Sequence, residues 1–323
     1  MRDALALVLT CRADATSDFL CSRLEREQIR FVRLDTDEVV GHVGLELSAG
    51  GQFLYVGEER YASGDIDTVI LRRPKPVAVG NAGDEFQQAH ASDEWAEAFE
   101  GYLASIPEAK WINHPSRNFA ASHKVHQLVE ARRCGLDVPA WVVTTNPMTA
   151  RKWIREWRGQ AIVKPLSGGY IQRAEPAEDS LIYTSPIDPT REELIDRIVA
   201  CPVLFQQRVR KRADVRLIYL DRTAVAAGLH ALDEDGEQRL DIRRDEMRDV
   251  EYSPMSIPSD VYAGVVCLMD SYGLRFGALD FAVGDSGRWH FLEINPNGQW
   301  AWLDEEGVCD VGKLFAAAAK PGA

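Results

Sequence analysis

Apolar and polar positions alternate in blocks along the chain, and the period within each block predicts an element of secondary structure. The first part alternates between strand-like apolar runs and helix-like amphipathic runs, which is typical of a βαβ opening. The expected elements are a strand at 4–10, a capped helix at 16–28, a strand at 29–35, a hairpin at 44–57, a strand at 67–74, a long helix at 84–106 and a short strand at 110–113. These patterns predict an α/β domain that ends near residue 113.

The second part begins with a helical pattern that starts at Pro115 and stops at Gly135. Strands at 139–145 and 161–165 flank a helix at 147–159, for which Asn146 is the N-cap candidate. The remaining elements are strands at 180–185, 202–209, 215–220 and 223–231, a helix at 259–273, a hairpin at 275–295 and a helix at 311–320. We predict three domains at 1–113, 114–205 and 206–323, and we interpret the charged segment 233–252 as a surface or active-site loop.

Composition narrows the function classes. The chain has 323 residues, 46% hydrophobic content and a net charge of -13, which argues against sequence-independent binding to nucleic acid. It has no apolar run long enough for a membrane span, and its start turns polar too soon for a signal peptide, so a soluble cytoplasmic protein is expected. The six cysteines include no C-x-x-C pair and are expected to be free, mostly buried thiols.

The hairpin at 275–295 carries the most informative side chains. For an even-numbered loop centred on Ser286 and Gly287, Asp280 lies opposite Glu293, and both project from one face. Asn295 shares that face, because side chains two residues apart on a strand point the same way. Three oxygen ligands would then converge, as Mg²⁺ prefers. The alternative is that the carboxylates are exposed strand residues and that Asn295 merely starts a turn.

Two lysines and a glycine-rich segment suggest phosphate binding. Lys164 ends an apolar strand and is followed by Ser167, Gly168 and Gly169, whose backbone N–H groups can approach phosphate oxygens. Lys124 lies in a helical pattern, where a solvated surface lysine is the alternative interpretation. The segment differs from a P-loop, in which the lysine opens a helix.

In chain order these features resemble the ATP-grasp superfamily, and most closely the ligases of the microviridin and plesiocin type that mature ribosomal peptides (graspetide synthetases). The resemblance spans roughly residues 68–315, and its most specific part is "NPNGQWAW" at 295–302. It implies an ATP-grasp fold within the α/β class with α+β elements: a Rossmann-like N-terminal domain, a small central domain and a C-terminal ATP-grasp domain. It also implies ATP and Mg²⁺, with two ions, as cofactors.

The resemblance also implies residue roles. The ATP-binding set is Lys124, Lys164, Ser167, Gly168, Gly169, Gln206, Gln207, Arg208 and Val209, where the superfamily often has Glu in place of Gln207. The catalytic set is Asp214 and Arg216, which match a D-x-R element, and Asp241 and Arg243, which resemble D-W-R with Ile242 in place of the aromatic residue. Either aspartate could be a general base or an arginine-orienting partner. The substrate-binding set is Arg72 and Arg73, from an R-R-P element, with Arg244 and Arg248, whose loop either docks a precursor peptide or is simply solvated.

The implied reaction activates a carboxylate as an acyl phosphate, after which a hydroxyl or an amine displaces phosphate to give an ester or amide cross-link in a precursor peptide. A ligase that adds a free amino acid to a peptide or protein, and a nucleotide-binding module without catalysis, are the alternatives. The expected partner is a precursor peptide with a leader and an acidic, hydroxyl-rich core, without nucleic acid or membrane; a homodimer is left open. The two tryptophans at 300 and 302 either pack in the core or wall the substrate side of the site.

Overall fold

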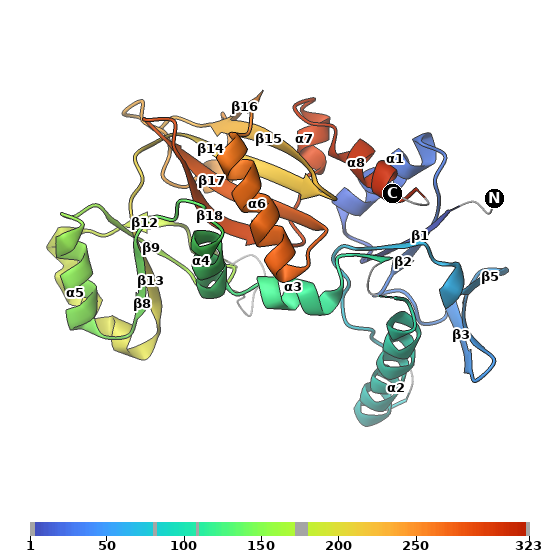
Figure 1. The fold of residues 1–323 in the computed structure, drawn as a ribbon. Coiled ribbons are helices and arrows are strands. Elements are labelled where there is room, and N and C mark those ends of the chain that lie inside the picture. The colour runs from blue at the N-terminus through green and yellow to red at the C-terminus, as the bar shows by residue number, and fades with distance from the viewer. Residues whose placement is uncertain (1–3, 80–82, 108–109, 172–179, 321–323) are drawn as a thin grey trace.

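In the computed structural model, which describes residues 4–79, 83–107, 110–171 and 180–320, the N-terminal part folds around a parallel sheet in the order β2-β1-β6-β7 (Figure 1). The strands are β1 (Leu5–Thr10), β2 (Arg30–Asp35), β6 (Thr68–Leu71) and β7 (Trp111–Ile112). A second sheet of three antiparallel strands comprises β3 (Val43–Ser48), β4 (Gly51–Val56) and β5 (Glu59–Ala62), and the short 3₁₀ helix η1 (Ser63–Asp65) follows it. The predicted βαβ opening and hairpin are confirmed.

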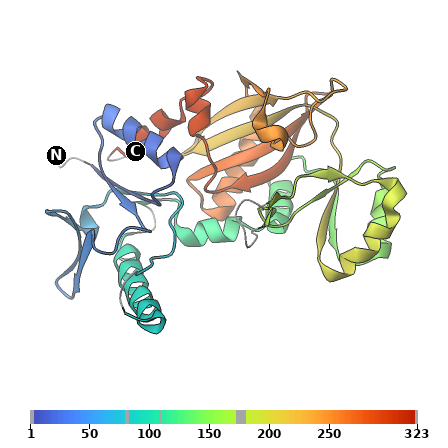
Figure 2. The same ribbon diagram turned by 180° about the vertical axis from the view of Figure 1, so that it is seen from behind.

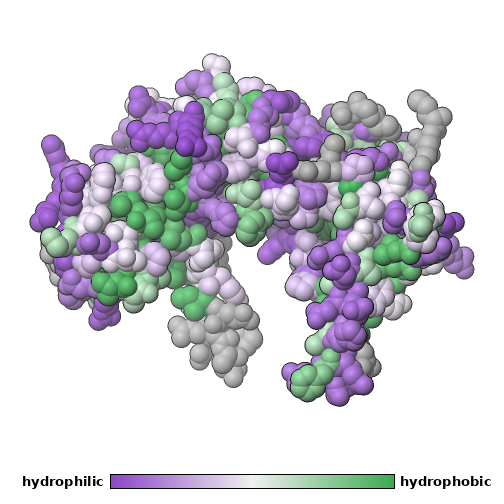
Figure 3. Space-filling model, turned by 60° about the horizontal axis from the view of Figure 1, so that its bottom comes forward, coloured by the Kyte–Doolittle hydropathy of each residue, from purple (hydrophilic) through white to green (hydrophobic). Residues whose placement is uncertain are grey.

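Two helices complete this part. Helix α1 (Ala15–Arg26) connects β1 to β2, and its apolar face is buried. Helix α2 (Glu85–Ala104) begins with a capping box, in which the Asp84 side chain accepts a hydrogen bond from the backbone N–H of Gln87 and the Gln87 side chain accepts one from the backbone N–H of Asp84. Figure 3 shows hydrophilic residues over much of α2, which projects from the body of the molecule at the lower right.

The next helical segment is broken in two. We predicted one helix between Pro115 and Gly135, but the chain forms α3 (Pro115–Ala121) and α4 (Lys124–Arg133). The Ser122 hydroxyl bonds back to the carbonyl of Phe119, and His123 adopts an extended conformation as the N-cap of α4. A serine that bonds locally offers the backbone an alternative to the helical ladder.

A small antiparallel sheet follows, in the order β12-β9-β13-β8. Its strands are β8 (Trp141–Thr144), β9 (Ala161–Lys164), β12 (Ser185–Pro186) and β13 (Val203–Gln207), and β10 (Tyr170–Ile171) pairs separately with β11 (Ser180–Leu181). Helix α5 (Pro147–Glu156), capped by Asn146 as predicted, and the 3₁₀ helix η4 (Pro189–Ala200) cover the sheet. Strand β13 crosses the proposed boundary between 205 and 206, and the three-domain division stays a prediction.

The large sheet is antiparallel in the order β16-β15-β14-β17-β18 (Figure 2). Its strands are β14 (Lys211–Leu220), β15 (Thr223–His230), β16 (Glu251–Pro254), β17 (Phe276–Gly284) and β18 (Trp289–Asn295). The charged segment 233–252, which we expected to be a loop, contains the 3₁₀ helix η5 (Arg244–Met247) and the start of β16.

Helices cover both faces of the large sheet. Side chains of α4 and α6 (Ser259–Tyr272) pack with Leu217 and Leu279 in one apolar cluster. The alternate strand residues, such as Ile218 and Ala278, pack with α1, α7 (Ala301–Glu305) and α8 (Val311–Ala318) in another. The N-terminal sheet contributes residues to this second cluster, so the N- and C-terminal parts of the chain share one core. No helix in the described ranges combines the length and the hydrophobicity that a membrane span requires.

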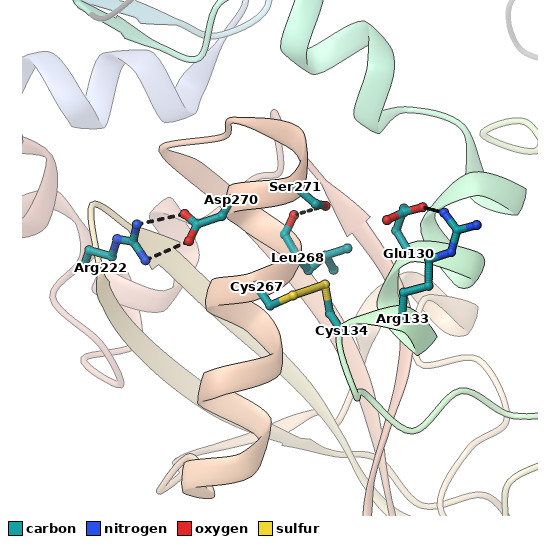
Figure 4. Close-up of a disulfide and its surroundings, with 8 residues drawn as sticks. All are labelled: Glu130, Arg133, Cys134, Arg222, Cys267, Leu268, Asp270 and Ser271. Atoms are coloured by element: carbon teal, nitrogen blue, oxygen red, sulfur yellow. Dashed lines mark hydrogen bonds and ion pairs between the residues drawn. A yellow bond between two sulfur atoms is a disulfide. The ribbon is translucent and has the colours of Figure 1, made fainter.

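The expectation of free cysteines is wrong for two of the six. Cys134, at the C-terminal end of α4, forms a disulfide with Cys267 on α6, with 5.5 Å between the Cα atoms (Figure 4). The two cysteines are 133 positions apart in sequence, and their pairing depends on α4 and α6 lying side by side in space, which no local pattern indicates. The free cysteines are Cys11, Cys21, Cys201 and Cys309, of which the first two are buried.

Candidate active site

A cavity of about 350 Å³ lies where the small sheet meets the large sheet. The structure brings thirteen of the predicted site residues to its walls: Lys124, Lys164, Gly168, Gln206, Gln207, Val209, Asp214, Arg216, Asp241, Arg243, Asp280, Glu293 and Asn295. They come from α4, β9, β13, β14, β17, β18 and the segments that follow β9, β13 and β15. Residues as far apart in sequence as Lys124 and Asn295 therefore share one volume.

The hairpin places its carboxylates as predicted. Asp280 is paired with Glu293 across β17 and β18, and Asn295, two residues on, is on the same face. Nearer the turn the register differs from the prediction, because the pairs there are shifted by one residue. A bulge after Asp280 restores the predicted alignment. Leu292 is the extra residue of the bulge, and its side chain also lines the cavity.

Both carboxylates lie against cations. Arg216 Nε is 2.9 Å from Asp280 Oδ1, and Lys124 Nζ is 3.1 Å from Glu293 Oε2. Burial raises the pKa of Asp280 to about 6 against the opposing effect of Arg216, and the nearby Glu293 adds to the rise. Burial would also raise the pKa of Glu293, but Lys124 and then Lys164 outweigh it and lower that pKa.

Asn295 contributes an amide oxygen at the end of β18. Its Oδ1 accepts a hydrogen bond of 3.0 Å from the backbone of Asn297, so the turn-forming role that we considered as the alternative is also present. Within the described part of the chain, no three His, Cys, Asp or Glu side chains gather into a metal-ligand group. The donor set here is two carboxylates and one amide, a mixture of oxygen ligands suited to Mg²⁺.

Lys124 links the large sheet to the end of the small sheet, where Lys164 lies. Burial lowers the pKa of Lys164, at the end of β9, to about 8. Lys124 Nζ donates a 3.1 Å hydrogen bond to the carbonyl of Pro165, so α4 is held against the end of β9. Lys124 therefore lies in the cavity wall, and the interpretation as a solvated surface lysine is wrong.

The glycine segment after β9 is only partly in the wall. Gly168 lines the cavity, whereas Ser167 is exposed outside it and Gly169 is buried beside it. Gly169 has a φ of +74°, and a Cβ there would lie 2.8 Å from the carbonyl oxygen of Ile182, so this turn requires glycine.

Asp214 and Asp241, the two candidates for a general base, both accept hydrogen bonds from neighbouring residues. Asp214 accepts hydrogen bonds of 2.6 and 2.7 Å from Lys211 Nζ and one of 3.0 Å from Gln238. Lys211 also lines the cavity and was missed by the sequence analysis, although it belongs to the basic run that precedes Asp214.

Asp241 forms a two-pronged pair with Arg243, with distances of 2.9 Å to Nε and 2.7 Å to Nη2, and it accepts a bond from the backbone of Thr184. Burial alone would raise the pKa of Asp241, but these hydrogen bonds outweigh burial and hold it well below its usual range. A carboxylate stabilised in its charged form is a weak base, so the arrangement supports the arginine-orienting role.

Arg72 is not in the cavity wall. Its side chain is 1% exposed, and its guanidinium donates to the carbonyl of Gly298 at 3.3 Å and to Gln299 Oε1 at 3.4 Å. The carbonyl of Gln299 in turn accepts from Arg216 at 3.5 Å. In this structure Arg72 supports the turn beside Arg216, and the predicted direct contact with substrate is not supported by its position.

Four other arginines also lie outside the cavity wall. Arg73, Arg208, Arg244 and Arg248 are all exposed. Arg244 donates to the carbonyl of Thr184 at 3.4 Å and lies over the ring of Tyr183, so the loop that carries it is anchored to the small-sheet side. The ATP-binding role of Arg208 and the substrate-binding role of Arg73, Arg244 and Arg248 stay predictions.

The two tryptophans divide the alternatives between them. Trp300 is fully buried and stacks on Phe315, whereas Trp302 lines the cavity and contacts the ring of Tyr252. The core interpretation is confirmed for Trp300. Trp302 packs partly against the core and also lies in the cavity wall, and the expectation that it faces the substrate stays a prediction.

The sequence matches no protein-family model and none of the curated proteins compared with it. The fold is similar to several solved structures. A RiPP-associated ATP-grasp ligase of Chryseobacterium gregarium, solved with ADP and a leader and core peptide, has a TM-score of 0.84 and 24% identity, with 98% of this chain and 95% of that chain covered. The macrocyclase MdnC of Microcystis aeruginosa, solved with the precursor peptide MdnA, has a TM-score of 0.78 and 22% identity, with coverages of 97% and 98%.

The ATP-grasp ligase PsnB, solved with a precursor variant, Mg and ADP, has a TM-score of 0.75 and 21% identity, with coverages of 99% and 98%. These similarities extend over nearly the whole chain in each case. The chain therefore shares the fold of these ATP-grasp ligases.

Proposed function

We propose that the protein is an ATP-dependent ligase that forms side-chain ester or amide cross-links in a ribosomally made precursor peptide. The observation that carries the proposal is the single cavity in which Asp280, Glu293 and Asn295 face a group of lysines and arginines. Three solved structures with this fold are ligases or macrocyclases bound to peptides, two of them with ADP.

The residues present fit a magnesium ion. Oxygens of Asp280, Glu293 and Asn295 lie on one face of the hairpin, and both carboxylates are held beside cations that a phosphate group would also attract. These three residues would hold the ion, with a second ion as part of the proposal. When bound, Mg²⁺ neutralises charge on the phosphate oxygens.

The chain's own residues account for carboxylate activation. The reaction we propose joins a substrate carboxylate oxygen to the γ-phosphorus of ATP and breaks the bond to the β-phosphate oxygen, which leaves with ADP. Lys124, Lys164 and Arg216 supply positive charge where the transferring oxygens would lie. Gln206 and Val209, at the end of β13 and just beyond it, line the side that would receive the base and ribose.

The second step is acyl transfer. A hydroxyl or amine of the same peptide attacks the acyl carbon, the bond to phosphate breaks, and the proton of the nucleophile is released to water or to the departing phosphate. Arg243, which Asp241 orients, lines the cavity and can bind a substrate carboxylate or the phosphate that leaves. The proposal assigns no general base. It places the protein in the cytoplasm, where ATP and newly made peptides are both present.

The experiment combines the protein with ATP, Mg²⁺ and peptides that carry acidic residues together with serine, threonine or lysine. The expected result is loss of one water per linkage by mass spectrometry, with one ADP formed for each. Glu293→Gln should abolish both signals, whereas the matched control Glu58→Gln, in an exposed turn, should retain them.

The rival functions give different results. A gain in mass by one amino acid would show a ligase that uses free amino acids. Absence of ADP with every peptide offered would leave a nucleotide-binding module and would overturn the proposal.

A further inference from the structure

Glu293 and Asn295 lie on β18, which is an edge strand of the large sheet. It is the last strand of the large sheet, with β17 along one side and, on the other side, an isolated bridge at His290, where the carbonyl of Asp137 accepts from the N–H of Phe291 at 2.7 Å. An edge strand has a row of backbone groups without a neighbouring strand, and such a strand is less firmly held. The residue between the two side chains is Ile294, so the backbone of Ile294 sets where both of them point.

Beyond that bridge, at Ile294, a buried glutamine takes the place of a neighbouring strand. Gln127, on α4, is 2% exposed. Its Nε2 donates to the carbonyl of Ile294 at 2.8 Å, and its Oε1 accepts from the N–H of Ile294 at 3.0 Å. The second Nε2 hydrogen has its own acceptor, the carbonyl of Ala121, at 2.6 Å. The amide thus pairs with Ile294 as a peptide group of another strand would.

The same helix carries a cation of the site. Lys124 lies three residues before Gln127 at the start of α4, and its Nζ contacts Glu293 Oε2 at 3.1 Å and the carbonyl of Pro165 at 3.1 Å. Helix α4 is therefore attached to β18 twice, once through a side chain of the site and once through the backbone beside it. The hydrogen bonds between Gln127 and the backbone of Ile294 limit how far Lys124 can move relative to Glu293.

We propose that Gln127 is a positioning residue that holds Glu293, Asn295 and Lys124 in one fixed geometry for the ion and the nucleotide phosphates. The proposal rests on the proposed function of this site. Gln127 does not line the cavity, and it acts through the backbone of Ile294. Groups that orient metal ligands in this way typically change metal affinity or activity by about 10- to 100-fold when removed.

The test is Gln127→Met, which keeps the length and approximate volume of the side chain and removes all three hydrogen bonds. The readout is the dissociation constant of Mn²⁺ in the presence of ADP, followed by electron paramagnetic resonance of the free ion, together with the unfolding temperature. We expect the dissociation constant to rise by about 10-fold or more.

The control is Ala131→Gly, a fully buried position on the same helix. Glycine weakens the helix but leaves the glutamine in place. We expect this variant to lower the unfolding temperature and to leave the Mn²⁺ dissociation constant within about twofold of wild type. If Gln127→Met does not fold, Gln127→Asn serves in its place, because it keeps the amide but is too short to make both bonds to Ile294.

The outcomes separate the two proposals. If the wild type binds no Mn²⁺ with ADP present, the proposed function itself fails. If the wild type binds Mn²⁺ and the Gln127 variant binds it equally well, only the positioning role is overturned. An equal weakening in the Gln127 variant and in Ala131→Gly would also overturn it, because general loosening of α4 would then be sufficient.

Discussion

Substitution of Gly298 by alanine tests how the turn after β18 controls Arg216. A Cβ at this position would lie 2.3 Å from the Cβ of Ala278 and 3.2 Å from Arg216 Nη1. Carbon atoms in contact prefer separations of about 3.5–4.0 Å, so the turn or the strand must move by about 1.5 Å. The carbonyl of Gln299, which accepts from Arg216, is in the same turn and would move with it.

The expected effects follow from that displacement. Overpacking of a filled site costs about 1–3 kcal/mol, and a misplacement of about 1 Å in a catalytic arrangement can cost about 100-fold in rate. We therefore expect Gly298→Ala to lower the rate of peptide-dependent ADP release by about 100-fold and to lower the free energy of unfolding by about 2 kcal/mol.

The assay is steady-state ADP release with a cross-linked peptide as product, alongside urea unfolding. The matched control is Gly101→Ala on α2, where a Cβ would meet nothing within 4 Å. That variant should gain up to about 1 kcal/mol from helix propensity and keep full activity. A Gly298→Ala protein with a wild-type rate would refute the link between this turn and the arginine.

Three other changes have distinct expected outcomes. Asp241→Asn should lower kcat/KM for the peptide by about tenfold with little change in KM for ATP, because Arg243 loses its two-pronged pair with a charged carboxylate. Equal changes in kcat/KM for the peptide and in KM for ATP, measured by steady-state kinetics, would contradict this. Reduction of the Cys134–Cys267 disulfide should lower the free energy of unfolding by about 2–4 kcal/mol, since it closes a long loop; identical urea curves with and without a thiol reductant would refute it. Arg72→Met should cost about 3 kcal/mol in the same assay, because it leaves buried acceptors without their cation, whereas the exposed Arg73→Met should change stability by less than about 0.5 kcal/mol.

The sequence predicts the local elements of this fold well, because their signals lie within a few residues. The capped helix after Asn146 and the hairpin from β17 to β18 are examples. The pairing of Asp280 with Glu293 was predicted from an even-numbered loop, although the turn has the other register and the bulge at Leu292 compensates. A β-bulge has no strong local signal in the sequence. The predicted face is therefore correct, although the predicted loop register is not.

The contacts that complete the site could not be predicted, since they join residues far apart in the chain. Gln127 and Ile294 are 167 positions apart, and nothing in either segment indicates the other. The burial of Arg72 could not be predicted either. Its motif suggests an accessible cation, but its burial depends on how the N-terminal sheet packs against the turn at Gly298. Long-range packing decides such cases, and residue type alone does not.

The most direct test of the account is a crystal structure of the protein with ADP and Mn²⁺, in which anomalous scattering locates the ion. We expect a peak in contact with carboxylate oxygens of Asp280 and Glu293 and the amide oxygen of Asn295, beside the nucleotide phosphates. Nucleotide bound elsewhere, or a peak remote from all three side chains at saturating ADP, would contradict it.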